Sequence, residues 1–240
     1  MNPELGGFDI ITPEKSRDWL VIGWFTPDYR GLAERFAGNL NRFAIPHHLF
    51  AKPIGSGWDT SRKPSVILEA MDLYPGKTII LMDVDCIING DIRPVLNFQR
   101  DVGFTLTPRR RRGYKQTILT ASSRVAVFKP TPASRRFAES WRELCVPGTN
   151  DEVNLVACFV RNGDVSYAQL DQRYAAWEVG EKNAPPGTVI WHQSAHAKAT
   201  ARTLRSIIRL AERPFRRGRS RAIKAAAANF GQPATREAAE

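Results

Sequence analysis

The fold is decided by the stretch Thr78-Ile79-Ile80-Leu81-Met82-Asp83-Val84-Asp85-Cys86-Ile87-Ile88-Asn89-Gly90-Asp91. It is an apolar run that ends in two carboxylates one residue apart, Asp83 and Asp85. Residues i and i+2 of an extended segment point to the same side, so both carboxylates can reach one hard cation. A continuously apolar run is typical of a central strand covered on both faces, and ligands bind at the carboxyl ends of such strands. The stretch therefore predicts a divalent-cation site that can neutralise a diphosphate.

Two further strands are expected before this one, each followed by a helix. The apolar runs at 18–26 and 47–51 predict strands, whereas the patterns at 29–43 and from Pro64 onward predict helices. This alternation is typical of an α/β domain with a Rossmann-type, doubly wound and mostly parallel sheet flanked by helices.

The second half of the chain is less regular and predicts mixed topology. Extended segments and helices are expected there, with strands at 102–106, 117–128 and 188–191 and helices at 132–144 and 151–161.

The size and composition favour one domain with a separate tail. A chain of 240 residues with 42% hydrophobic residues can bury one sizeable core. We expect a catalytic domain over residues 1–198 and a basic tail over 199–240. No apolar run reaches the roughly 18 residues of a membrane span, and no early segment has the form of a signal peptide, which predicts a cytoplasmic protein. Three scattered cysteines predict buried thiols rather than disulfides or a zinc site: Cys86, Cys145 and Cys158.

The positive charge is concentrated in the tail. Of the net charge of +11, residues 201–240 hold ten Lys and Arg against three Glu, a net of +7, which leaves +4 for residues 1–200. Apolar residues recur at helical spacing among the arginines from Leu204 to Ala211, which predicts a basic amphipathic helix, followed beyond Pro214 by a flexible end. Such a helix suits an anionic membrane surface, so a peripheral position at the inner membrane is expected. Nucleic acid is not favoured, because the basic clusters lack interleaved aromatic residues.

With its apolar strand and the continuation to Asp91-Ile92, Asp83-Val84-Asp85 resembles the LDxDxxxxxDI signature of GT-A glycosyltransferases that use nucleotide-diphosphate sugars. The resemblance implies a GT-A fold. It also implies that Asp83 and Asp85 bind Mn²⁺ or Mg²⁺ bridging the donor phosphates, with UDP-sugars as the favoured donors. The acceptor would be a saccharide or a lipid-linked sugar.

A second segment, Val189 to Lys198, is similar to the late IHxxGxxKPW element of glycogenin-like retaining transferases. The resemblance implies that His192 is the third metal ligand and that Lys198 contacts the donor diphosphate. Ala195 replaces the glycine of that element, and Ala199-Thr200 replaces its Pro-Trp. His196 stays an alternative ligand, and inversion stays an alternative to retention.

A third segment, Asn150-Asp151-Glu152-Val153-Asn154-Leu155, resembles the DQDxLN helix start of the same enzymes. It implies that Asp151 and Asn154 contact sugar hydroxyls, and in an inverting enzyme Asp151 or Glu152 would be the catalytic base. An ordinary helix N-cap explains the same residues equally well.

The resemblance assigns other residues to the donor. Phe25, Thr26 and Tyr29 follow the first strand, where GT-A enzymes hold the base, although an aromatic residue there also suits the core. Lys63 corresponds to the basic residues near the phosphates and the metal-binding Asp. Gln172 and Trp177 belong to a late loop whose polar and aromatic side chains suit a sugar.

Two other functions fit parts of the sequence. A haloacid-dehalogenase-like phosphatase also uses Asp-x-Asp after an apolar strand, but its motif opens the domain, and here two predicted strands precede Asp83. A non-catalytic membrane-binding or nucleic-acid-binding protein would explain the basic tail, with the body as a scaffold.

Overall fold

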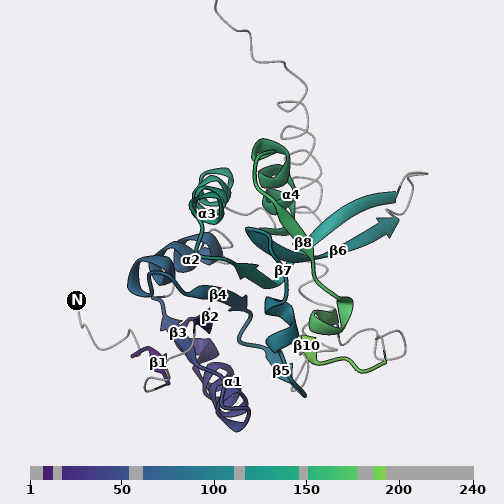
Figure 1. The fold of residues 1–240 in the computed structure, drawn as a ribbon. Helices are drawn as coiled ribbons and strands as arrows, with labels where there is room; N and C mark the ends of the chain where they lie inside the picture. The colour runs from purple at the N-terminus through teal and green to yellow at the C-terminus, as the bar shows by residue number, and fades with distance from the viewer. Residues whose placement is uncertain are drawn as a thin grey trace, which may run out of the picture. The chain divides into compact units, whose positions relative to one another are not determined.

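We describe a computed structural model of the chain over residues 8–12, 18–53, 62–110, 117–145, 151–177 and 186–192. A mixed seven-stranded sheet runs through it, with strands in the order β1-β3-β2-β4-β7-β6-β8 (Figure 1). The strands are β1 Ile10–Ile11, β2 Trp19–Phe25, β3 His47–Ala51, β4 Thr78–Met82, β6 Val102–Arg110, β7 Thr117–Phe128 and β8 Tyr167–Gln169.

The three strands predicted in the first half form the parallel centre of this sheet. β2 pairs in parallel with β3 on one side and with β4 on the other, and β8 is parallel to β6. The pairs β1–β3, β4–β7 and β6–β7 are antiparallel. The expected mixed α/β sheet is confirmed, with parallel pairs making up half of it rather than most of it.

A small second sheet lies beyond the end of β4. It consists of β5 Cys86–Ile88, β10 Ile190–His192 and β9 Ala176–Trp177, in that order. β10 is antiparallel to β5, with His192 opposite Cys86, and parallel to β9, with His192 opposite Trp177. The late strand predicted at 188–191 therefore begins at Ile190, and its pairing carries His192 to the residues that follow Asp85.

Helices cover the two faces of the main sheet unequally. α2 Arg62–Leu73, α3 Pro132–Leu144 and α4 Asp151–Arg161 pack on one face and share a core with Ile79 and Leu81. α1 Arg30–Arg42 and the small sheet pack on the other face, around Ile80 and Met82. Both faces of β4 are therefore buried, which explains its continuous apolar run. Short 3-10 helices occur at Pro27–Tyr29, Arg93–Leu96 and Gln172–Tyr174.

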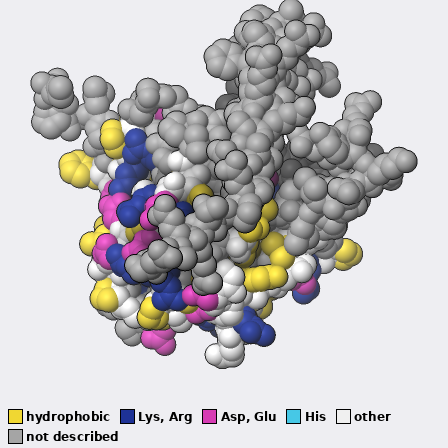
Figure 2. Space-filling view, turned by 90° about the horizontal axis from the view of Figure 1, so that it is seen from above, with side chains coloured by type: hydrophobic (Ala, Val, Ile, Leu, Met, Phe, Trp, Pro, Cys, Tyr) yellow, Lys and Arg dark blue, Asp and Glu magenta, His cyan; other side chains and the backbone are white. Residues whose placement is uncertain are grey.

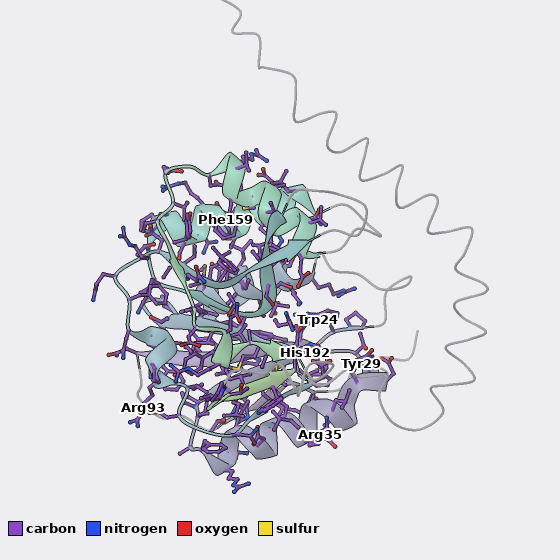
Figure 3. The ribbon with its side chains drawn as sticks, turned by 90° about the vertical axis from the view of Figure 1, so that its right-hand side faces the viewer. Trp24, Tyr29, Arg35, Arg93, Phe159 and His192 are labelled. Carbon is purple, nitrogen blue, oxygen red and sulfur yellow. The ribbon has the colours of Figure 1, made fainter. Side chains whose placement is uncertain are left out.

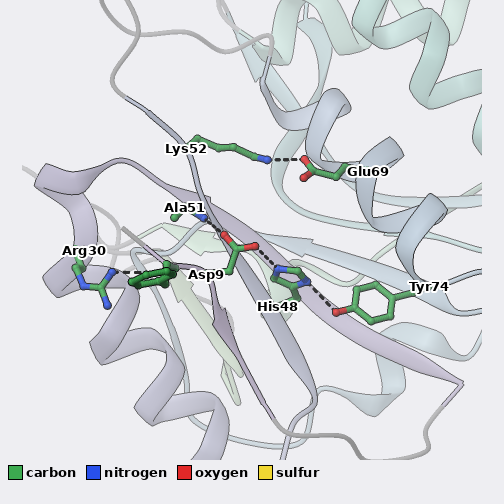
Figure 4. A network of polar contacts seen from close by, with 8 residues as sticks. Asp9, Arg30, His48, Ala51, Lys52, Glu69 and Tyr74 are labelled. Atoms are coloured by element: carbon green, nitrogen blue, oxygen red, sulfur yellow. Dashed lines mark hydrogen bonds and ion pairs between the residues drawn. The ribbon is translucent and has the colours of Figure 1, made fainter. Parts of the chain in front are cut away.

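A polar network fixes β1 to the edge of the sheet (Figure 4). The Asp9 carboxylate lies 2.7 Å from Nε2 of the buried His48 and accepts a hydrogen bond of 2.6 Å from the backbone N–H of Ala51. Nδ1 of His48 lies 2.8 Å from the hydroxyl of Tyr74, at the end of α2. A strand of two residues has few ladder hydrogen bonds, so these side-chain contacts hold it in place.

The surface of the described part mixes both signs of charge. Figure 2 shows basic and acidic side chains interspersed on one face. Exposed ion pairs such as Arg135 with Asp72 and Arg136 with Asp164 belong to this pattern. No helix among the described residues is long and apolar enough to cross a membrane. Cys86 and Cys158 are buried, Cys145 is half-buried, and none of these three described residues forms a disulfide. The boundary at 198 and the tail 199–240 lie outside the described residues.

Candidate functional site

Three side chains capable of binding a metal meet at the carboxyl end of β4. Nε2 of His192 lies 3.0 Å from Oδ1 of Asp85 and 3.3 Å from Oδ2 of Asp83. One ligand atom of each residue falls within 4.8 Å of the others. The side chains of Asp83, Asp85 and His192 are 22%, 13% and 9% exposed, so the cluster is shielded but open at Asp83.

The local fold explains how the carboxylates are held. Asp83 follows the last residue of β4, and its carbonyl accepts a hydrogen bond of 3.0 Å from the backbone N–H of Cys86, which closes a tight turn around Asp85. Val84 is buried and anchors this turn in the core. The turn leads directly into β5, whose Ile88 exchanges backbone hydrogen bonds with the side-chain amide of Asn39 on α1. The position of Asp85 is thus fixed from both sides of the turn.

Lys63, in the first turn of α2, reaches one of these carboxylates. Its Nζ lies 2.9 Å from Oδ1 of Asp83 and donates a hydrogen bond of 3.0 Å to the hydroxyl of Ser123 on β7. Lys63 is 9% exposed, and a buried ammonium requires such partners. The structure therefore brings Lys63 and Asp83 together, as the resemblance implies.

The charges in the cluster shift the pKa of two of its members. Burial acts to raise the pKa of Asp83, but the charges and hydrogen bonds of Lys63 and His192 outweigh it and lower that pKa to about 2. Burial acts to lower the pKa of His192, but the two carboxylates outweigh it and raise that pKa to about 9. Burial also raises the pKa of the Cys86 thiol, so Cys86 stays protonated and is a poor nucleophile.

The residues fit a divalent cation. Two carboxylates and an imidazole form a ligand set suited to several divalent cations, including Mn²⁺ and Mg²⁺ when oxygen ligands are added. Among the described residues, the buried Oδ1 of Asp85 has no hydrogen-bond donor beyond its ion pair with the His192 ring. A buried carboxylate oxygen in that position is costly unless a cation neutralises it. Asp83, Asp85 and His192 can therefore hold a metal ion.

One aromatic side chain, that of Tyr29, lies near this cluster after β2. Tyr29, labelled in Figure 3, is the aromatic residue of this side whose phenol senses the cluster. Burial raises the pKa of the Tyr29 phenol, and the charges of Asp28 and Asp85 raise it further, which places Tyr29 within electrostatic reach of the carboxylates. The hydroxyl of Thr26 donates a hydrogen bond to Asp28.

Phe25 differs from the sequence-based expectation. Its ring is 2% exposed and packs in the apolar core with α1 residues such as Ala33 and Phe36. The odd-numbered residues of β2 face α1, so the ring of Phe25 is directed inward and is not available to stack on a base. Of the aromatic residues predicted to hold the base, Tyr29 is the one that lies within electrostatic reach of the carboxylates.

The residues assigned to a sugar come from two other elements. Glu152 is half-buried and Asn154 is buried on α4, which packs against β7 and α3. Gln172 is exposed in a 3-10 helix that leads into β9, where the backbone of Trp177 pairs with His192. The side chains of Asp151 and Trp177 lie outside what the structure describes, as do Lys198 and His196. The roles of these residues stay predictions.

Two residues of β7 at this site were not singled out from the sequence. Ser123 contacts Lys63, and the carbonyl of Arg124 accepts a hydrogen bond of 3.1 Å from the backbone N–H of Asp83. Ser-Ser-Arg inside a strand has no pattern that predicts a site. Only the pairing of β7 with β4 shows that these residues lie at the site.

The fold was compared with those of solved structures, and the sequence with known families and proteins. No family model and no curated protein matches the sequence. The chain is similar to a glycosyltransferase involved in the glycosylation of the major capsid of PBCV-1, at 10% identity and a TM-score of 0.54, over 78% of this chain and 95% of that one. It is also similar to mouse xyloside xylosyltransferase 1, at 11% identity and a TM-score of 0.48, over 76% of this chain and 99% of that one. A third likeness is to the galactosyltransferase LgtC, at 10% identity and a TM-score of 0.43, over 80% and 94%. The first of these shows that the chain has the GT-A fold predicted from its sequence.

Proposed function

We propose that this protein is a metal-dependent glycosyltransferase that moves a sugar from a nucleotide-diphosphate donor to an acceptor hydroxyl. The observation that carries the proposal is the meeting of Asp83, Asp85 and His192 at the end of β4. In open α/β sheets this edge is where ligands bind. The shared fold is consistent with the proposal and does not by itself assign an activity.

The residues of the site have distinct tasks in this reaction. Asp83 and Asp85 offer oxygen ligands, and His192 offers a nitrogen ligand once its ring is neutral. A divalent cation held there supplies Lewis-acid chemistry that neutralises the leaving nucleoside diphosphate. Lys63 keeps Asp83 ionised and adds positive charge next to the phosphates, a task that the resemblance also gives to Lys198.

The remaining assignments extend this proposal to the sugar and the base. Tyr29 and Thr26 lie on the side of the site where a base would stack, and UDP-sugars are the favoured donors. Asn154, Gln172 and Trp177 would contact the sugars. The resemblance favours retention at the anomeric carbon, whereas Asp151 or Glu152 would act as base in an inverting enzyme. The anomeric configuration of the product, read by NMR, decides between these outcomes.

Calorimetry tests the core of the proposal. We expect a nucleoside diphosphate from the panel UDP, GDP, CDP, ADP and dTDP to bind in the presence of Mn²⁺ or Mg²⁺ and to lose most of that affinity when the ion is chelated. The variant Asp85→Asn should lose metal-dependent binding, whereas Asp164→Asn, at an exposed ion pair, serves as the charge-matched control. Full metal-dependent binding by Asp85→Asn would contradict the proposal.

A phosphatase reading is less well supported. Asp83 follows β4. Two other strands of the parallel part of the sheet, β2 and β3, come before β4 in the chain. Its carboxylate is engaged by Lys63 and His192 rather than presented as a nucleophile. Hydrolysis of phosphomonoesters faster than release of sugar from the nucleotide donors would favour the phosphatase.

The tail carries a separate proposal about location. We propose a cytoplasmic protein whose residues 199–240 bind an anionic membrane near a lipid-linked acceptor. The full chain should float with vesicles that contain anionic lipid, and a chain ending at Lys198 should not. Equal flotation of both chains would place any membrane contact elsewhere.

A further inference from the structure

β6 and β7 continue past the rest of the main sheet as a two-stranded ribbon. After a β-bulge in β7, where the register shifts behind Phe104, residues 105–110 stay paired with residues 117–122. In the described part of the chain neither of these segments pairs with another strand, because β4 reaches only to Val125 of β7 and β8 only to Phe104 of β6. Figure 1 shows the two strands extending together beyond their neighbours. We call residues 105–110 and 117–122 the ribbon.

The ribbon begins at the metal site. β7 runs antiparallel to β4, whose last residue Met82 lies opposite Val125. The residues of β7 before Val125 therefore lie beyond the carboxyl end of β4, where Asp83 follows. At about 3.3 Å per residue, the ribbon extends roughly 17 Å from Ser122 to Thr117. A ligand that reaches from the carboxylates to the end of the ribbon is therefore longer than a single sugar.

The ribbon lies on the side of the site away from the residues predicted to hold the base. In the sheet order β2-β4-β7, the strands β2 and β7 flank β4 on opposite sides, and Tyr29 follows β2. The helix α4, which carries the predicted sugar ligand Asn154, packs against β7. Leu155 of α4 shares a core with Leu106 and Ala121 of the ribbon. The ribbon thus continues the part of the site predicted to hold sugars.

The end of the ribbon is strongly basic. β6 ends with Arg109 and Arg110, which lie opposite Ile118 and Thr117 in the ladder. The sequence of residues 105–122 contains no Asp or Glu, and its basic residues are Arg109, Arg110, Arg111, Arg112 and Lys115. Of these, Arg109 and Arg110 have a described place in the ladder.

The chain contains another pair of adjacent arginines with a different environment. Arg135 and Arg136 on α3 form exposed ion pairs with Asp72 and Asp164. In contrast, the sequence around the ribbon supplies no acid, since residues 102–138 contain no Asp or Glu. A guanidinium is costly to bury without such a partner, and it binds phosphate or carboxylate through two parallel hydrogen bonds. The ribbon therefore carries positive charge suited to an anionic ligand.

We propose that the ribbon binds an anionic group of the acceptor, a phosphate or a carboxylate, through Arg109 and Arg110. This proposal rests on the proposed function and adds the chemical class of the acceptor. The acceptor is a saccharide or lipid-linked sugar that carries negative charge at a distance from the hydroxyl that receives the sugar.

Calorimetry with matched acceptor analogues tests the proposal. The wild-type chain is first saturated with Mn²⁺ and the nucleoside diphosphate that it binds best, so that the donor site is occupied. It is then titrated with pairs of ligands that differ mainly in charge. These are tetragalacturonate and its methyl ester, maltotetraose with and without a terminal phosphate, and glucose linked to a prenyl chain with and without a diphosphate, in neutral detergent micelles. The anionic member of at least one pair should bind roughly tenfold or more tightly than its neutral counterpart.

The double variant Arg109→Gln, Arg110→Gln should lose this preference. Because charged hydrogen bonds to the anion are lost, its Kd for the preferred ligand should rise roughly 10- to 100-fold. That Kd should also depend less on salt concentration than in the wild type, since fewer charges are there to be screened. The affinity for Mn²⁺ and for the nucleoside diphosphate should be unchanged.

Two further double variants separate this role from a structural one. Arg109→Lys, Arg110→Lys keeps the charge and loses the planar fork, so an intermediate Kd with the salt dependence of the wild type is expected. This variant tests the proposal even where the glutamine variant does not fold. Arg135→Gln, Arg136→Gln removes the same charge from adjacent exposed arginines, and its Kd should equal that of the wild type.

The possible outcomes are distinguishable. A selective loss of the anionic ligand in the glutamine variant of the ribbon supports the proposal. Equal binding of both members of every pair, no binding of any anionic member, or an unchanged Kd in the folded variant overturns it and leaves the proposed function intact. Weaker binding of the variant to sugar-free anionic vesicles or to single-stranded DNA, with acceptor binding unchanged, also overturns it and assigns the ribbon to that partner. Absence of metal-dependent diphosphate binding by the wild type would instead refute the proposed function, and this inference with it.

Discussion

Nε2 of His192 lies 3.0 Å from Oδ1 of Asp85, although one residue ends the last described strand and the other occupies the turn after β4. The antiparallel pairing of β10 with β5 produces this contact, because it sets His192 opposite Cys86, the neighbour of Asp85. The small sheet thus supplies His192 to the cluster, whereas Asp83 and Asp85 follow β4 of the main sheet.

The raised pKa of His192 predicts competition between protons and metal. With a pKa of about 9, the ring is protonated at neutral pH and must lose its proton to become a ligand. The affinity for Mn²⁺ should therefore rise with pH, by about tenfold per unit below pH 9. Calorimetry in buffers of different ionisation enthalpy should show about one proton released per ion bound near pH 7.

The variant His192→Gln provides the control for this competition. It should bind Mn²⁺ more weakly, and its affinity should change little between about pH 6 and 8, because the remaining ligand Asp83 titrates far lower, with a pKa of about 2 before His192 is removed. A wild-type affinity that is flat over the same range would show that His192 is not a ligand.

Gly23 is predicted to control the position of the metal-binding turn. A Cβ at this position would lie 2.9 Å from the carbonyl oxygen of Met82 and 3.3 Å from a methyl of Val84. Gly23→Ala must therefore push the end of β4 and its turn aside, at a cost of roughly 1–3 kcal/mol in the free energy of unfolding. We expect lower stability in urea together with weaker Mn²⁺ binding.

The matched change lies in α1. A Cβ at Gly38 meets no heavy atom within 4 Å, and the residue is exposed in the helix. Gly38→Ala should raise the free energy of unfolding by roughly 0.5–1 kcal/mol, as expected for glycine in a helix interior, and leave Mn²⁺ binding unchanged. Equal stability of the two alanine variants would show that the close approach at Gly23 can be relieved at little cost.

Some parts of the site could be predicted from the sequence for physical reasons. β4 is buried on both faces, so its apolar run and the carboxylates that end it are visible without knowledge of any partner. Lys63 and His192 were assigned through resemblance, and the structure brings both to Asp83.

The parts that could not be predicted depend on pairing between distant segments. β5 and β10 have three residues each, which is too short for any periodicity, and their register is set by each other. The bulge at Ser123-Arg124 results from a mismatch between β6 and β7 that neither strand shows alone. The inward direction of Phe25 follows from which face of β2 the helix α1 covers, and the sequence of β2 is apolar on both.

Asp101 is predicted to be a structural carboxylate that joins three elements. One of its oxygens accepts a hydrogen bond of 2.7 Å from the hydroxyl of Thr131, the N-cap of α3. The other accepts hydrogen bonds from the backbone N–H and the hydroxyl of Ser166, before β8, at 3.0 and 2.6 Å. Burial acts to raise the pKa of Asp101, but these hydrogen bonds outweigh it and lower the pKa.

Removal of this carboxylate should be costly. Asp101→Ala leaves the half-buried donors of Thr131 and Ser166 without their acceptor and should lower the free energy of unfolding by roughly 1–3 kcal/mol in urea titrations. Asp164→Ala, which breaks only an exposed ion pair with Arg136, should change it by less than about 1 kcal/mol. A similar small change for both variants would contradict the structural role of Asp101.

His47 is predicted to make the folded protein sensitive to mild acid. Burial lowers the pKa of this histidine below 6.5, and a nearby His48 lowers it further, while a hydrogen bond to the carbonyl of Ile45 acts in the opposite direction. As the pH falls through about 6.5, the unfolded chain therefore binds a proton at His47 more readily than the folded chain does. The contribution of neutral His47 to the free energy of unfolding is fully present above this pH and is lost below it. His192 does not obscure the effect, because its raised pKa gives a contribution that is fully present below 6.5 and is lost only as the pH rises toward 9. The urea midpoint should thus fall between about pH 6.5 and 5 in the wild type and fall less in His47→Gln, which cannot titrate. The same fall in both proteins would assign the acid sensitivity to other groups.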